Sequence, residues 1–296
     1  MNNSFSFLHY AVDLHVHIGP EIIPRKYRSV AELIKSQGTK LGGVALKNHF
    51  FPTAPMVPKT KNGTMRIVGS VVLNSFVGGI NPDAVYAAST LADGPFIVWF
   101  PTVSAKQFLI NSAWEIAPEW VDPKKPFIAR RSTDVIPLAV TTSSGVLTDS
   151  VIHVLKAIQT TGAILATGHI SWKESRTVIK KAAAMGIQKM IVTHPIYQKI
   201  AMPISVQKEL AASGALMEQC WSMWRIDNIP IRAIADQIRS VGPEHCIITS
   251  DAGQSFSPPP RMALEEFCRA LLREGISQKA LKRMCIQNPK RLIAMI

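Results

Sequence analysis

Short apolar runs alternate along the chain with segments in which apolar residues recur every three or four positions. Runs of the first kind are typical of buried strands, and segments of the second kind are typical of helices that cover a sheet. The alternation starts at Ala11 and predicts βα units around a parallel sheet. Strands are expected over eight stretches: 11–17, 43–49, 66–75, 96–103, 163–169, 190–194, 215–220 and 246–251.

The intervening segments predict helices, several of which start beside a residue type that caps helix N-termini. The capping candidates are Ser29, Asn81 and Ser171. The helices are expected over 29–37, 82–92, 150–161, 171–185, 206–212, 231–241, 260–273 and 277–284.

Eight strands, each followed by a helix or a covering loop, favour an α/β fold of the (β/α)8 TIM-barrel type over an open doubly wound sheet. The sequence has no G-x-G-x-x-G after the first strand and no Walker-type loop, so the nucleotide-binding open sheets lack their fingerprints. In the second strand Val44 and Leu46 share one face, while Ala45, Lys47 and His49 share the other. In a barrel the first set packs beneath the helices and the second points inward.

The 296 residues fit a single domain over 1–296, because barrels of this type use such a length as one unit. A long irregular stretch follows the fourth strand, over about 104–145. Loops of this length are usually functional or disordered. Its two tryptophans and its apolar run over 136–140 favour an ordered insertion, which we interpret as a lid over the site.

Composition narrows the class of protein. Hydrophobic residues make up 47% of the chain, which supports a large core and argues against disorder. The four cysteines are widely spaced and form no C-x-x-C, so neither a disulfide framework nor a thiolate zinc site is indicated. The N-terminal residues lack the pattern of a secretory signal and no long apolar stretch follows, so a cytoplasmic protein without a membrane partner is expected.

The formal net charge of +13 is compatible with nucleic-acid binding, an anionic substrate or a solvated basic surface. Lysines and arginines are scattered in short pairs, and no basic arm or aromatic-studded basic helix stands out. We therefore expect no nucleic-acid partner and favour a small anionic substrate. The barrel is further expected to form a homo-oligomer.

Candidate chemistry begins at the end of the first strand, in Asp13-Leu14-His15-Val16-His17. Side chains alternate along a strand, so His15 and His17 point the same way, roughly 6–7 Å apart, close enough to hold one metal ion. The alternative is a pair of polar residues on a solvated face. The choice between these two alternatives depends on whether later strands also end in residues that can bind a metal.

Four more polar residues stand where later strands are expected to end. In a parallel barrel all strand C-termini open on one face, where active sites lie, so these side chains converge with His15 and His17. Imidazoles with one carboxylate are typical ligands of zinc and related divalent ions. Such an ion lowers the pKa of water, and a nearby acidic group can move its proton. The four residues are His49, His169, His194 and Asp251.

This order of residues resembles the amidohydrolase superfamily of metal-dependent hydrolases. The ending Gln287-Asn288-Pro289-Lys290-Arg291-Leu292 is similar to the Asn-Pro-x-x-x-Leu ending of many members. The segments 13–20 and 46–53 resemble an uncharacterised branch of that superfamily, a domain of unknown function.

The resemblance implies a metal centre with one or two ions, zinc first and Mn, Fe or Ni as alternatives. It makes His15 and His17 ligands of a first metal, and His169 and His194 ligands of a second or shared one. Asp251 would be both ligand and general base.

Many binuclear members bridge their metals with a carbamylated lysine or a glutamate on the fourth strand, whereas that strand here offers Trp99 and Pro101. The candidates to substitute for that group are Lys47, His49 and Glu218. His49 fits a metal-binding, substrate-binding or orienting role. Lys47 could be carbamylated, bind an anion, or pair with a buried carboxylate.

Several residues are candidates for substrate contact. Trp99 and Trp221 would form an aromatic wall around a ring substrate, with packing beneath the lid as the alternative. The pair Arg130 and Arg131 in the insertion would bind a substrate carboxylate or phosphate.

The sequence thus predicts a metal-dependent hydrolase acting on an amide, cyclic amide, lactone or ester. One alternative keeps the metal and changes the reaction to decarboxylation or phosphoester hydrolysis. The other is a non-catalytic basic barrel that binds a partner or acts as a scaffold.

Overall fold

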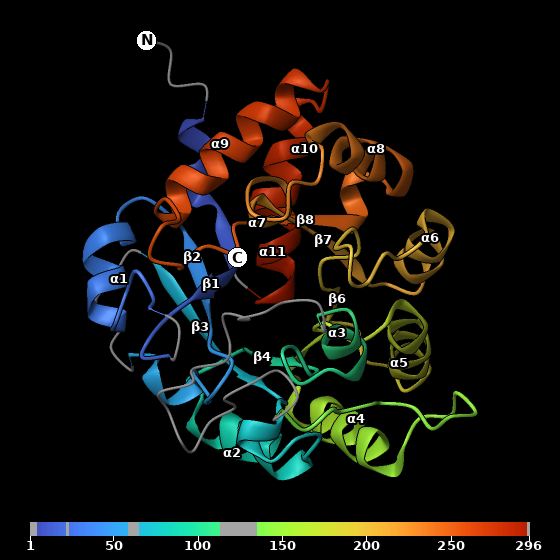
Figure 1. Cartoon of the computed structure of the whole chain (residues 1–296). Helices are drawn as coiled ribbons and strands as arrows, with labels where there is room; N and C mark the ends of the chain where they lie inside the picture. The colour runs from blue at the N-terminus through green and yellow to red at the C-terminus, as the bar shows by residue number, and fades with distance from the viewer. Residues whose placement is uncertain (1–4, 22–23, 59–64, 113–134, 295–296) are drawn as a thin grey trace.

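The computed structural model describes residues 5–21, 24–58, 65–112 and 135–294. Eight parallel strands form one sheet in sequential order, and backbone hydrogen bonds join its two edges, because the N–H of His17 donates to Ala252 O at 2.8 Å and that of Asp251 donates to His15 O at 3.0 Å. The predicted TIM barrel is therefore confirmed (Figure 1). The strands are β1 (Val12–His17), β2 (Gly43–Lys47), β3 (Arg66–Val72), β4 (Phe96–Trp99), β5 (Ile164–Ala166), β6 (Met190–Val192), β7 (Leu216–Cys220) and β8 (Cys246–Thr249).

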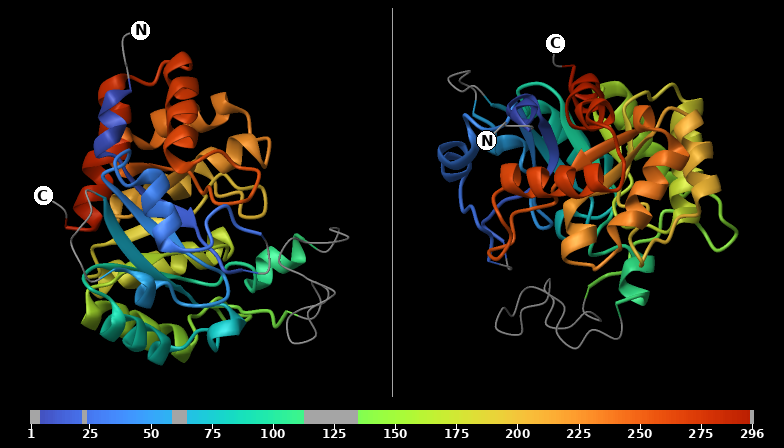
Figure 2. Two further views of the ribbon diagram at one scale, coloured as in Figure 1. Left: turned by 90° about the vertical axis from the view of Figure 1, so that its left-hand side faces the viewer. Right: turned by 90° about the horizontal axis from the view of Figure 1, so that it is seen from above.

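Helices surround the strands, and the N-terminal turn lies beside the C-terminal helices (Figure 2). The predicted caps Ser29, Asn81 and Ser171 accept backbone hydrogen bonds at the starts of α1, α2 and α5, and Ser171 forms a full capping box with Glu174. The helices are α1 (Val30–Gln37), α2 (Pro82–Leu91), α3 (Lys106–Ile110), α4 (Asp149–Thr161), α5 (Trp172–Ala184), α6 (Ile204–Ala212), α7 (Trp221–Arg225), α8 (Ile231–Val241), α9 (Pro260–Arg273), α10 (Gln278–Lys282) and α11 (Asn288–Leu292), with 3₁₀ turns η1 (Ser6–Tyr10), η2 (Ala54–Met56), η3 (Ser75–Val77) and η5 (Pro243–His245) and a π-helical turn η6 (Arg283–Gln287).

The strands separate two apolar cores. Val44 and Leu46 of β2 belong to the outer core beneath the helices, whereas Ala45 belongs to a smaller core inside the barrel. This is the alternation predicted for the second strand. Leu292 and Ile293, at the end of α11, join the inner core, so the chain's last helix plugs the end of the barrel opposite the strand C-termini.

Strand β1 departs from strict alternation, because it contains one residue more than its partner. Asp13 pairs with Val44 but Val16 pairs with Leu46, so β1 spans three steps where β2 spans two. Such a bulge reverses which side chains face inward. Leu14 therefore lies in the inner core, and His15 also points into the barrel from the adjacent position.

Most strands are shorter than predicted. The structure ends β5 at Ala166 and β6 at Val192, so His169 and His194 lie in the turns that follow rather than within the strands, as the expected bounds had placed them. The strands end early because the chain turns left-handed just beyond them. Gly168 and His194 have φ of 61° and 43°.

The insertion after β4 is described only at its two ends. It starts with α3, and the bridge between Ala105 and Leu138 returns the chain toward α4. The central part of the expected lid, including Arg130 and Arg131, lies outside the described residues.

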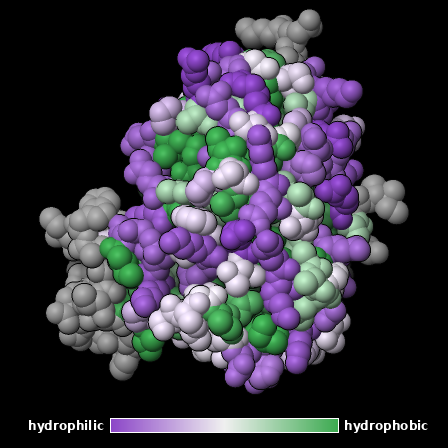
Figure 3. Space-filling model, turned by 90° about the vertical axis from the view of Figure 1, so that its right-hand side faces the viewer, coloured by the Kyte–Doolittle hydropathy of each residue, from purple (hydrophilic) through white to green (hydrophobic). Residues whose placement is uncertain are grey.

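The outer surface is predominantly polar on the face shown in Figure 3, where apolar residues form only small patches. Over the described ranges, no helix is long and apolar enough to cross a membrane.

Candidate metal centre and cavity

A cavity of about 210 Å³ opens at the C-terminal ends of the strands and is lined by five of the six predicted strand-end residues, all except His15. It is smaller than the usual ligand pocket of about 300–1,000 Å³, which favours a small ligand. Its polar and charged lining consists of His17, Arg25, Lys47, His49, His169, His194, Tyr197, Lys199, Ser222, Asp227, Asp251 and Gln254. Its apolar lining consists of Val103, Phe108, Met223, Ile226 and Phe256.

Three predicted ligands converge most closely. Asp251 Oδ1 lies 2.9 Å from His15 Nε2 and 3.0 Å from His17 Nε2. A third imidazole, that of His194, faces the same carboxylate, with Nε2 3.7 Å from Asp251 Oδ2. All four side chains are at least 88% buried. We call these four residues the His₃Asp cluster.

The geometry of the His₃Asp cluster fits a divalent ion. Ligand atoms at about 2.0–2.2 Å from a tetrahedral ion lie roughly 3.3–3.6 Å from one another, close to the separations seen here. Asp251 Oδ1 is buried and receives no hydrogen bond from the described residues, although two ring nitrogens are within 3.0 Å. A buried oxygen in that state calls for a ligand.

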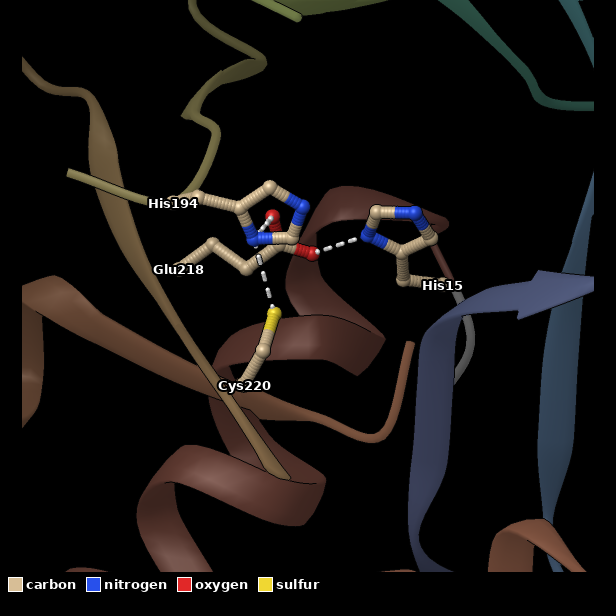
Figure 4. Close-up of side chains that lie close together, drawn as sticks. All are labelled: His15, His194, Glu218 and Cys220. Atoms are coloured by element: carbon tan, nitrogen blue, oxygen red, sulfur yellow. Dashed lines mark hydrogen bonds and ion pairs between the residues drawn. The ribbon is translucent and has the colours of Figure 1, made fainter. Parts of the chain in front are cut away.

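Glu218 on β7 positions two of these histidines (Figure 4). Its Oε1 lies 2.9 Å from His15 Nδ1, and its Oε2 lies 3.3 Å from His194 Nδ1. Both rings therefore turn Nε2 toward Asp251, which is the carboxylate–histidine arrangement of metal sites. Glu218 does not line the cavity, but it also belongs to a buried group with His15, His194 and Cys220 whose ligand atoms lie within 4.8 Å of one another, so its metal-binding role stays a prediction.

The surroundings of Glu218 keep it ionised. Burial alone would raise the pKa of its carboxyl, but His15 and His194 beside it hold that pKa down at about 2. Thr249 Oγ1 also donates to Oε1 at 3.0 Å. Cys220 completes the group, with Sγ 3.1 Å from His194 Nδ1. The carboxylate thus pairs with His15 Nδ1 through Oε1, while Oε2 faces His194 Nδ1 without a hydrogen bond from the described residues.

Backbone strain accompanies two of the ligands. His194 and Asp251 each stand two residues beyond a strand and have φ of 43° and 52°, a region that L-residues seldom adopt. Strained backbone of this kind clusters at functional sites. It brings both side chains over the barrel mouth.

The electrostatics distinguish His15 from the other histidines. Burial would lower the pKa of His15, but the carboxylates of Asp251 and Glu218 outweigh it and raise that pKa. Burial would likewise raise the pKa of Asp251, but His15 and His17 hold it well below its usual range. The pKa of His17 is itself lowered, chiefly by burial. A proton and a metal ion would therefore compete for His15.

Lys47 lies inside the barrel against the cluster. Its Nζ is 2.9 Å from His15 Nε2 and 4.4 Å above the ring of Trp99. Two donors cannot face each other at that distance, so one of the two nitrogens acts as acceptor. Burial lowers the pKa of Lys47 despite the attraction of Asp251. Trp99 therefore supports Lys47 from the inner core and is not part of the cavity lining.

His49 and His169 line the cavity farther from Asp251. Thr102 Oγ1 is 2.9 Å from His49 Nδ1, which fixes that ring. The ring of His169 lies 4.9 Å from that of Phe108, and its buried Nδ1 has no hydrogen-bond partner in the described parts of the chain. Burial lowers the pKa of both histidines well below the usual value, so both are neutral at pH 7.

Sequence reasoning missed two charged residues in the loop after β1. Arg25 Nε pairs with Glu21 Oε2, and the side chains of both are nearly fully buried. Glu21 Oε1 accepts the backbone N–H of His49 at 2.7 Å. Glu21 could join His17 and His49 in a second metal group, but both its oxygens are already engaged. The position of Arg25 in the first βα loop could have identified it, because barrel active sites are built from these loops.

Among the described residues, the two predicted substrate contacts Trp99 and Trp221 do not line the cavity. Trp221 is buried at the start of α7, donates through Nε1 to Glu266 at 2.8 Å, and does not line the cavity. Trp221 therefore fits the alternative given above, in which the tryptophan packs in the protein and does not contact the substrate. Arg130 and Arg131 lie outside the described residues, so their role stays a prediction.

Comparison with known protein sequences gives a match to a family model. A family described as "Family of unknown function (DUF6282)" matches residues 10–218. No curated protein sequence matches the chain.

Solved structures match over 97% of this chain at low sequence identity. An amidohydrolase from Pseudomonas aeruginosa is 11% identical with a TM-score of 0.59 and 96% of its own chain covered. A putative 2-pyrone-4,6-dicarboxylic acid hydrolase from Pseudomonas putida is 10% identical (TM-score 0.55, 98% covered). A dihydroorotase is 13% identical (TM-score 0.56, 69% covered). At such identities the likeness confirms the predicted resemblance at the level of the fold, and the family that matches is, as expected, one of unknown function.

Proposed function

The chain belongs to DUF6282, a family of unknown function, and we propose that it is a metal-dependent hydrolase of a small anionic substrate. Activated water would cleave an amide, cyclic amide, lactone or ester bond. The observation that carries this proposal is the contact of Asp251 Oδ1 with two imidazole nitrogens at 2.9 and 3.0 Å.

The proposed ligands are His15, His17 and His194 through Nε2, and Asp251 through a carboxylate oxygen. Three imidazoles and one carboxylate favour zinc, with Mn, Fe or Ni as alternatives. An ion held there would supply Lewis-acid polarisation and lower the pKa of water beside it. His49 and His169 are close enough to extend the ligand set to a second ion, and this wider set stays part of the proposal.

Asp251 is placed to move a proton. Ser222 Oγ donates to its Oδ2 at 2.7 Å and fixes the carboxylate plane. The other oxygen has no donor among the described residues, and the low pKa keeps the group ionised at pH 7. The carboxylate can therefore accept a proton from water and pass it to the leaving group.

Neighbouring side chains would bind and shield the substrate. Lys47 and the neutral His169 both line the cavity and offer nitrogens for hydrogen bonds to a carbonyl oxygen. Phe108 and Met223 form part of its apolar wall, which excludes water around the reacting bond.

A substrate panel tests the proposed activity. We expect the metal-loaded protein to turn over at least one of an activated ester, a lactone and a cyclic imide. Asp251→Asn should lower kcat/KM by about 100-fold or more, because it removes the proton acceptor. The control Asp236→Asn changes a carboxylate on α8 whose side chain is 54% exposed, and it should leave turnover unchanged.

Other outcomes of the panel contradict the proposal. Turnover confined to a phosphomonoester would indicate a phosphoesterase, and loss of CO₂ without hydrolysis would indicate a decarboxylase. A protein that binds no metal and turns over none of the panel would be a non-catalytic binding barrel.

A further inference from the structure

Arg25 is a buried cation in the cavity wall whose guanidinium is only partly used. Its side chain is 1% exposed, and Nε pairs with Glu21 Oε2. The two terminal nitrogens, Nη1 and Nη2, are buried and have no hydrogen-bond partner among the described residues. Buried donors are almost always paired, so this edge of the guanidinium calls for an acceptor beyond the described residues.

Glu21 cannot supply that acceptor. Its Oε2 is used by Arg25 Nε, and its Oε1 accepts the backbone N–H of His49 at 2.7 Å. Glu21 thus holds the guanidinium from one side and leaves the Nη1–Nη2 edge to the cavity that Arg25 lines.

The backbone fixes Arg25 relative to the metal centre. Arg25 forms an antiparallel bridge with Gln254, in the loop that follows β8 and carries Asp251. The next residue, Lys26, donates its backbone N–H to Gly253 O at 2.7 Å. Gln254 in turn donates to Asp251 O at 3.0 Å. Arg25 and Asp251 are therefore held on two joined loops at one end of the same cavity.

The remaining lining suits a small organic anion. Lys47 and Lys199 line the cavity with nitrogen atoms and Asp227 is a second carboxylate beside Asp251, while Phe108 and Phe256 offer apolar surface. Asp251 is already paired with histidines and Ser222. A planar guanidinium edge with two parallel N–H groups matches a carboxylate.

We propose that Arg25 binds a carboxylate of the substrate through Nη1 and Nη2 and so selects small carboxylate-bearing substrates. The role of this anion as a substrate rests on the proposed hydrolase function. The anion site itself does not.

Calorimetric titration of the purified protein tests the site without measuring turnover. The probes are benzoate and benzamide, which have nearly the same shape and differ in charge, together with inorganic phosphate. The unaltered protein should bind benzoate at least about tenfold more tightly than benzamide, because only benzoate pairs with Arg25. Equal affinities would overturn the proposal and need no variant to interpret.

Two substitutions locate the effect. Arg25→Gln should lower benzoate affinity at least about tenfold and remove the preference over benzamide. Arg25→Lys keeps a cation beside Glu21 and so preserves the fold, but it lacks the two-nitrogen edge and should weaken benzoate binding to an intermediate degree. The control Arg28→Gln removes the same charge from an exposed position on the same loop and should change nothing.

Unchanged benzoate affinity in folded Arg25→Lys or Arg25→Gln protein would overturn the proposal. Phosphate binding that depends on Arg25 and is tighter than benzoate binding would overturn the choice of carboxylate. Metal content and hydrolysis are not readouts here, so the anion site can stand while the hydrolase proposal fails, and the reverse.

Discussion

Three of the four residues of the His₃Asp cluster have a neighbour that sets their orientation, and His17 is the exception among the described contacts. Glu218 turns the rings of His15 and His194, and Ser222 fixes the carboxylate of Asp251. The sequence could place Glu218 at the barrel mouth but could not separate a ligand from an orienting group. That distinction depends on which oxygen meets which ring nitrogen, and only the folded side chains determine it.

Replacing Glu218 with Gln tests its orienting role. The amide lacks the negative charge that faces both imidazoles, so we expect metal affinity to fall about 10- to 100-fold with the fold retained. Competition with a zinc chelator measures the change. Glu209→Gln is the matched control, because Glu209 lies at the surface with Arg176 and Lys180. Equal zinc affinity for Glu218→Gln and the unaltered protein would remove Glu218 from the metal centre.

At the scale of elements, alternating apolar runs predicted every strand, and capping residues predicted three helix starts. The pattern could not show the bulge in β1, because the extra residue is visible only against the register of β2. Nor could it show that Arg25 enters the cavity, which depends on its backbone bridge to Gln254, far along the chain. Asn288, part of the family-like ending, has a structural role and donates to Cys246 O at the start of β8.

The turn after β5 is expected to be intolerant of any side chain at Gly168. A Cβ there would lie 2.2 Å from Phe100 O, and the residue has φ of 61°. Gly168→Ala should therefore lower the free energy of unfolding by about 3 kcal/mol, measured by urea denaturation. Gly186 has φ of 83°, but a Cβ added there would meet no atom within 4 Å, so Gly186→Ala should cost only about 1 kcal/mol. Equal costs for the two substitutions would contradict the close approach of Gly168 to the end of β4.

At the scale of the whole molecule, the barrel collects several neutral histidines in a buried site while the chain carries a net charge of +13. Composition and the order of strand ends were enough to predict the barrel and its open face, and the single domain over 1–296 stays a prediction. The homo-oligomer and the cytoplasmic location stay predictions. The four cysteines are free and buried, as expected.

Because the site contains buried neutral histidines, the free energy of unfolding of the metal-free protein should fall in acid. Burial lowers the pKa of His194 from 6.5 to about 4. Between these values the unfolded chain binds a proton that the folded chain does not, so the free energy of unfolding falls as pH decreases through this window. His194 alone should contribute a loss of about 2 kcal/mol between pH 7 and pH 5.

Urea denaturation of chelator-treated protein at both pH values measures this dependence. His194→Gln should remove about 2 kcal/mol of it, whereas His153→Gln, at an exposed position, should leave it intact. An unchanged pH dependence in His194→Gln would show that His194 titrates normally in the folded state.

Elemental analysis of purified protein and of a His15→Gln/His17→Gln double variant tests the central claim most directly. The account predicts about one or two divalent ions per chain in the unaltered protein after reconstitution and gel filtration, and loss of most of that metal in a folded double variant. Full metal occupancy in the double variant, or none in the reconstituted unaltered protein, would contradict it.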